Sequence, residues 1–138
     1  MPDKDYSATP LYKKLGIKRR SRVAIVGAPA HFRSLIDPLP EAVRISRRAT
    51  GAHDVIVAFE SREAELKRSF ASLRKALDPA GGLWIAYPKR SSDIATDLTF
   101  ESVQKAGLNA GLVDNKSCAI DHTWSAVRFV YRLKDRPR

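Results

Sequence analysis

Three short stretches of the sequence are apolar over most of their length, instead of alternating between apolar and polar residues: they are 22–27, 53–59 and 83–87. Strands have this pattern when both faces of their sheet are buried, as in parallel sheets covered by helices. Segments with helical patterns separate the three runs, and strands that alternate with helices form layered α/β domains. The sequence therefore predicts a mostly parallel sheet between two layers of helices.

The remaining elements follow from local signals. We expect helices at 10–16, 28–36, 61–77 and 99–106 and further strands at 43–46, 110–119 and 123–133. In the third helix, apolar residues from Leu66 to Leu77 recur every three or four positions, and Ser61 can cap its start. Only 120–122 joins the last two strands, and so short a link requires an antiparallel pair. The expected fold class is a three-layer, Rossmann-like α/β domain with a C-terminal antiparallel hairpin.

The length and the single cysteine bound the possible classes of protein. A chain of 138 residues fits one domain, with 1–8 and 134–138 expected as flexible basic tails. No apolar run approaches the roughly 20 residues that a membrane-spanning helix needs, and no signal peptide is visible, so we expect a cytoplasmic protein. Cys118 alone cannot form an internal disulfide or a cysteine-based zinc site, and we expect no metal.

The positive charge is concentrated at the two ends of the chain. The net charge is +10. Residues 1–22 carry seven basic and two acidic side chains, 128–138 carry five and one, and the part between them is nearly neutral. Basic ends can bind nucleic acid through its phosphates. They can equally be solvated termini that aid solubility, because few aromatic residues accompany them.

Two resemblances to known families stand on specific strings of residues. VAIVG at 23–27, HDVIV at 53–57 and LDPAGGLWI at 77–85 resemble strands and turns of Rossmann-like methyltransferases that use S-adenosylmethionine (SAM). A second resemblance runs from Leu11 to about Arg132 and is to a bacterial family, domain of unknown function 3052. It is carried by KLGI at 14–17, RVAIVGAP at 22–29, PKRSS at 88–92, ATDL at 95–98, GLVDNK at 111–116 and TWS at 123–125. It implies a methyltransferase-like fold and brings no established activity.

A SAM site of the methyltransferase type needs a glycine-rich turn after the first strand and a carboxylate after the second, which binds the ribose hydroxyls. Here Gly27 is followed by Ala28 and by Pro29, which has no amide donor. Arg47 and Arg48 follow the second strand, where the carboxylate is expected. The sequence therefore predicts a degraded cofactor site. Two arginines there could instead accept a phosphate.

Polar residues follow the ends of the predicted strands, where an open parallel sheet has its ligand crevice. The candidate ligand-binding residues are Gly27, Lys89, Ser91, Ser92, Asp97, Asp114, Asn115, Lys116, Asp121, Thr123, Trp124 and Arg128. A pocket that holds Lys89, Lys116 and Arg128 together would suit a small anionic ligand. Alternatively, the aspartates pair with these cations and with turn amides, and Trp124 is a core residue.

No residue pattern identifies a catalytic group. Cys118 and His122 flank a hairpin turn without a third, orienting residue, and Ser125 lacks the G-x-S-x-G elbow of hydrolases. Cys118, Asp121 and His122 make at most part of a metal site. His31 and His53 are single histidines beside predicted elements, where structural roles are commoner than catalytic ones.

The preferred hypothesis is a non-catalytic binding or regulatory domain with a degraded nucleotide or SAM site, a polar pocket for a small anion and no bound cofactor. An alternative is a small SAM-dependent methyltransferase in which the loop 89–97 replaces the usual contacts. A second alternative is nucleic-acid association through the basic termini. The sequence does not decide the oligomeric state.

Overall fold

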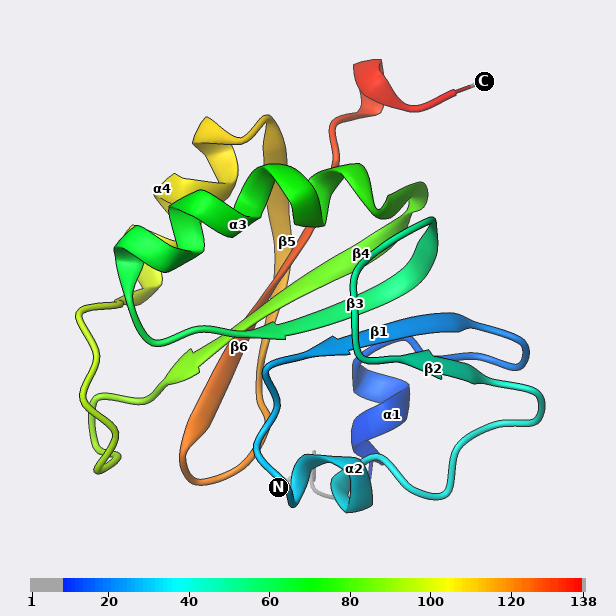
Figure 1. Ribbon diagram of the computed structural model, residues 1–138, viewed down its shortest axis with the longest axis horizontal. Helices are drawn as coiled ribbons and strands as arrows, with labels where there is room; N and C mark the ends of the chain where they lie inside the picture. Colours follow the sequence, from blue (N-terminus) through cyan, green and yellow to red (C-terminus); the bar gives the residue numbers. More distant parts are fainter. Residues whose placement is uncertain (1–8, 138) are drawn as a thin grey trace.

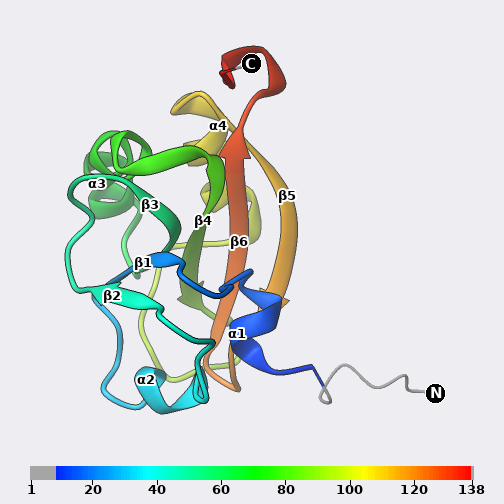
Figure 2. The ribbon, with the colours of Figure 1, turned by 90° about the vertical axis from the view of Figure 1, so that its right-hand side faces the viewer.

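The computed structural model describes residues 9–137 (Figure 1). Six strands form one sheet in the order β2-β1-β3-β4-β6-β5. The strands are β1 (Arg22–Val26), β2 (Arg44–Ser46), β3 (His53–Phe59), β4 (Leu77–Pro88), β5 (Leu112–Ala119) and β6 (Trp124–Tyr131). The strands from β2 to β4 are parallel, whereas β6 runs antiparallel to β4 and to β5. Figure 2 shows β6 between β4 and β5. The predicted fold class is confirmed.

Helices cover both faces of this sheet, and each face has its own core. The helices are α1 (Leu11–Lys14), α2 (Phe32–Leu35), α3 (Glu63–Lys75) and α4 (Phe100–Asn109), and a 3-10 turn, η2 (Leu133–Asp135), follows β6. Figure 1 shows α3 and α4 on one side of the sheet and α1 and α2 on the other. Phe70 and Phe129 belong to the first core, and Leu15 and Trp84 belong to the second. Both faces are therefore apolar, as the unbroken apolar runs require.

All four helices differ in their ends from the expected stretches: α1 and α2 are shorter than 10–16 and 28–36, and two further ends have a physical cause. Leu77 continues the apolar stripe of α3 but begins β4, where it pairs with His53. Gly107 was expected to end α4, yet the helix continues to Asn109, because Gly107 is a site of close packing against the ring of Phe129. The expected stretch 61–77 is therefore shorter as a helix, and 99–106 is longer.

The expected tail at 1–8 lies outside the described residues, as does residue 138, whereas η2 falls partly within the expected tail at 134–138. None of the helices described between residues 9 and 137 is long and apolar enough to span a membrane.

Candidate functional site

The strand order places a crevice at the carboxyl ends of β1 and β3. After β1 the chain adds β2 on one side, and β3 then pairs on the other side of β1. Parallel sheets bind ligands at such a reversal. Gly27 ends β1 with φ +69°, and a Cβ atom there would lie 3.3 Å from the carbonyl oxygen of Phe59. Glycine therefore lets the turn after β1 lie close against β3.

A hollow of about 570 Å³ opens beside this turn, and we call it the cofactor groove. Its lining is Ile25, Gly27, Ala28, Pro29, Ala30, Phe32, Arg33, Ile45 and Arg47. The charged side chains in this lining are both arginines, and Arg33 pairs with Asp37 at 2.8 Å. Arg47 is exposed and stands where a ribose-binding carboxylate is expected. The groove offers hydrogen-bond donors to a ligand and no carboxylate acceptor.

Buried aromatic rings form the wall between this groove and the β5–β6 hairpin. The ring centroids of Phe32 and Phe59 are 4.9 Å apart, and those of Phe59 and Trp124 are 5.0 Å apart, both edge to face. Trp124 is only 8% exposed. It is therefore a core residue, and its ring is not free to stack on a ligand.

Asp121 joins the turn after β1 to the same hairpin. Its Oδ2 lies 2.9 Å from Nε2 of His31, and its Oδ1 accepts the amides of Thr123 and Trp124 at 2.8 and 2.9 Å. Partial burial would raise the pKa of Asp121, but the hydrogen bonds from His31 and the two amides outweigh it and the pKa is lowered. These contacts give Asp121 a structural role in the turn. Thr123 takes part in the same turn through its backbone amide.

A second hollow of about 650 Å³ lies at the carboxyl end of β4, and we call it the loop groove. Lys89, Asp97 and Ser125 are in its lining. Oδ1 of Asp97 accepts the amide of Glu63 at 2.8 Å and so caps α3, the task expected of Ser61. Ser91 and Ser92 lie in the loop that follows β4, outside this lining. Ser91 is exposed and Ser92 is half-buried.

Lys116 and Arg128 lie away from Lys89. They are partners in the β5–β6 ladder, and the Arg128 guanidinium lies over Gly82, in the middle of β4. Both line a third hollow, of about 470 Å³, at the amino ends of β1 and β3, which we call the amino-edge groove. Its lining is Lys13, Lys14, Gly16, Lys18, Arg19, Arg20, Ser21, Asp54, Val55, Ala80, Gly81, Lys116 and Arg128. The expected pocket of three cations is thus divided between opposite edges of the sheet.

Two other candidates have no groove of their own. Both carboxylate oxygens of Asp114 accept Nε2 of Gln104, at 3.2 and 3.3 Å, which ties β5 to α4. Asn115 is exposed at an irregularity of the β5–β6 ladder.

Cys118 is half-buried, and burial raises the pKa of its thiol against the opposing charge of Lys14. A protonated thiol is a poor nucleophile.

Sequence reasoning missed Glu60, which directly follows β3 at the reversal of strand order. Burial raises the pKa of Glu60, although Oγ of Ser69 donates to its Oε2 at 3.1 Å and partly opposes the shift. The acid turns toward α3 and away from the cofactor groove lining. The sequence signal that could have identified Glu60 is a carboxylate directly after a buried strand. Within residues 9–137, no three metal-binding side chains cluster.

Known structures match this fold over most of the chain. A SAM-dependent methyltransferase from Aquifex aeolicus is 13% identical, with a TM-score of 0.59 and 85% of each chain covered. Magnesium protoporphyrin IX methyltransferase from Synechocystis, with bound SAH, is 10% identical, with a TM-score of 0.59 and coverage of 88% of this chain and 78% of that one. Ribosomal protein L11 methylase from Lactobacillus delbrueckii is 12% identical, with a TM-score of 0.57 and coverage of 87% and 74%.

Neither a family model nor a curated protein matches the sequence. The resemblance to domain of unknown function 3052 therefore stays a prediction. At identities of 10–13% the solved structures establish architecture alone. The chain has the Rossmann-like fold of SAM-dependent methyltransferases.

Proposed function

We propose that the protein is a SAM-dependent methyltransferase whose cofactor binds in the cofactor groove. The observation that carries the proposal is the open hollow beside Gly27, at the carboxyl ends of β1 and β2. The positive φ of Gly27 supports it, because glycine adopts this conformation without strain and so allows the tight turn that borders the hollow. The matched methyltransferase structures favour this function over the non-catalytic domain that the sequence suggested.

The residues present fit the adenine part of the cofactor better than its ribose. Ala28, Pro29 and Ile45 offer apolar surface in the groove, whereas Arg47 replaces the carboxylate that would accept the ribose hydroxyls. Bound SAM would supply an activated methyl group on a sulfonium centre. The loop groove, at the carboxyl end of β4 and so on the same edge of the sheet, is an open hollow in which a methyl acceptor could bind.

Isothermal titration with SAM and with its demethylated product tests this proposal. The wild-type protein is expected to bind both. Arg47→Asp should tighten binding by about tenfold, because a hydrogen bond to a charged group contributes about 1.5–3 kcal/mol. Arg48→Asp is the matched control, since Arg48 is also exposed but lies outside the groove lining. The absence of heat from wild type and Arg47→Asp alike, with bare protein in native mass spectra, would exclude a SAM site.

One observation favours a second function, a non-catalytic domain that binds a phosphorylated nucleotide. Arg33 and Arg47 are the charged side chains of the cofactor groove, and guanidinium groups bind phosphate well. Adenosine 2′,5′-bisphosphate separates the two functions. If the second function is correct, Arg47→Asp weakens binding of this probe, and neither wild type nor the variant binds SAM measurably. If the first holds, the same substitution strengthens SAM binding.

A further inference from the structure

The amino-edge groove gathers positive charge from distant parts of the sequence. Its lining holds seven basic residues and one acidic residue. The cations come from α1, from the segment between α1 and β1, from β5 and from β6. Lys14 and Lys116 also share the lining of a neighbouring hollow. The fold thus brings a basic N-terminal segment against two cations of the hairpin.

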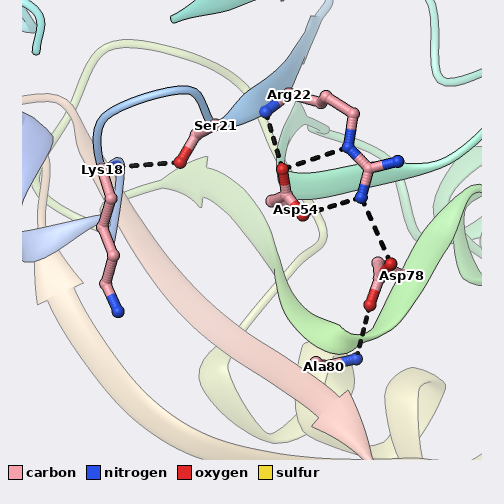
Figure 3. Close-up of polar contacts among 6 residues, drawn as sticks. All are labelled: Lys18, Ser21, Arg22, Asp54, Asp78 and Ala80. Carbon is pink, nitrogen blue, oxygen red and sulfur yellow. Dashed lines mark hydrogen bonds and ion pairs between the residues drawn. The ribbon is translucent and has the colours of Figure 1, made fainter. Parts of the chain in front are cut away.

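The one carboxylate of the lining is already paired with a cation outside it. Asp54 accepts the amide of Arg22 at 2.8 Å and its guanidinium at 2.8 and 3.2 Å, and Asp78 accepts the same guanidinium at 3.2 Å (Figure 3). Asp78 also accepts the amide of Ala80 at 2.9 Å. Arg22 therefore neutralises one of these two carboxylate charges, and the seven basic residues of the lining still leave the groove with a large excess of positive charge.

One of these cations, Arg128, is partly withdrawn from solvent. Its side chain is half-buried over Gly82, and burial together with the charge of Arg136 lowers its pKa. Across residues 9–137, its guanidinium has neither an ion-pair partner nor a hydrogen-bond acceptor. Its donors are therefore available to an anion that enters the groove, and charge-assisted hydrogen bonds of this kind are strong.

The groove lining points to phosphate as the anion and to the nucleic-acid backbone as its source. The lining has no aromatic side chain to stack on a base and no large apolar side chain to enter a membrane. Many cations around a concave surface suit a polymer that presents phosphates in series. We propose that the amino-edge groove binds the phosphate backbone of a nucleic acid with little sequence preference. This site lies at the opposite edge of the sheet from the cofactor groove and does not depend on methyl transfer.

Fluorescence anisotropy of the full chain with labelled RNA and DNA duplexes of about 20 base pairs, a span wide enough to give several phosphate contacts, tests this site. In low salt, the double variant Lys116→Gln/Arg128→Gln should bind about tenfold or more weakly than wild type. The slope of log K against log salt should fall by about two, roughly one for each lost phosphate contact. Arg68→Gln/Lys105→Gln, which removes the same charge from the exposed faces of α3 and α4, should leave both quantities nearly unchanged.

A second variant keeps the test decisive if the loss of Arg128 harms folding. Lys13 and Lys18 are exposed, so Lys13→Gln/Lys18→Gln should keep the melting temperature of wild type and still weaken duplex binding. Equal weakening by the groove variants and by Arg68→Gln/Lys105→Gln would overturn the proposal. Binding without salt dependence would also overturn it, and so would binding to inorganic phosphate or to phosphatidylglycerol vesicles but not to duplexes.

Discussion

The two edges of the sheet are built from different interactions. At the carboxyl edge, buried rings and the contact between His31 and Asp121 hold the turn after β1 against the hairpin. At the amino edge, the ion pairs of Arg22 lie beside a groove in which cations far outnumber carboxylates, although Arg19 of its lining pairs with Glu41 at 2.9 Å. The same strands thus end in an apolar wall on one side and a charged surface on the other. A fold match describes the shared strands, whereas the chemistry of a member depends on what its edges carry.

Removal of Trp84 is the strongest way to break the amino edge. Trp84 is 1% exposed, and its indole Nε1 donates to the carbonyl of Leu15 at 2.9 Å, which anchors the segment that follows α1. Trp84→Ala should lower the free energy of unfolding by about 3–5 kcal/mol, as for other buried large residues. Trp84→Phe keeps most of the packing and should lose about half as much or less. Urea unfolding measures both, and equal losses would show that the ring contributes little.

Two glycines allow a sharper comparison of how tightly each region packs. A Cβ on Gly107 would collide with the enclosed ring of Phe129, so Gly107→Ala should cost about 1–3 kcal/mol of unfolding free energy. A Cβ on Gly82 would meet the end of Arg128, a flexible side chain that can move aside. Gly82→Ala should therefore cost less but weaken duplex binding, although it removes no charge. Unfolding and anisotropy together check this, and unchanged binding would speak against a role for the position of Arg128.

Acid should weaken both edges, by a smaller amount. Hydrogen bonds from Arg22 hold the pKa of Asp54 below its ordinary value, and the pKa of Asp121 is lowered as described above. A carboxylate with a lower pKa in the folded state stabilises the fold above its unfolded pKa, and that contribution is lost as the pH falls through the folded value. Unfolding free energy should therefore decline between about pH 5 and pH 2.

The matched variants assign this acid dependence to one edge or the other. Asp54→Asn removes the amino-edge contribution, and Asp121→Asn removes that of the carboxyl edge. Each variant should flatten part of the decline in urea-unfolding curves measured across this pH range. If neither variant changes the pH profile, these two carboxylates do not carry it.

Sequence reasoning succeeded where the signal is local. The buried runs predict parallel strands, the link 120–122 predicts an antiparallel pair, and the position of Arg47 after β2 follows from chain order alone. It failed where a contact with a residue distant in the sequence determines the local structure. Leu77 fits a helical stripe but pairs with His53 instead, because strand pairing outweighs the local pattern.

The candidate site was less predictable than the fold for the same reason. Asp97 caps a helix that begins 34 residues earlier in the chain, which no spacing rule indicates. The side-chain direction of Arg128 carries it over Gly82, away from Lys89, and so divides the expected pocket. Residue types therefore indicated an anion-binding protein, but only the three-dimensional arrangement shows which cations can act together.

The four-residue helix α1 is far too short to persist in isolation. The wall that α1 gives to the amino-edge groove therefore exists only while the chain at Leu15 stays packed on Trp84. An anion held between this wall and β6 would fasten the first helix of the described chain to its last strand. A bound anion would then link these two elements. The melting temperature would rise with the concentration of the anion, and amide exchange would slow at both ends of the described chain together.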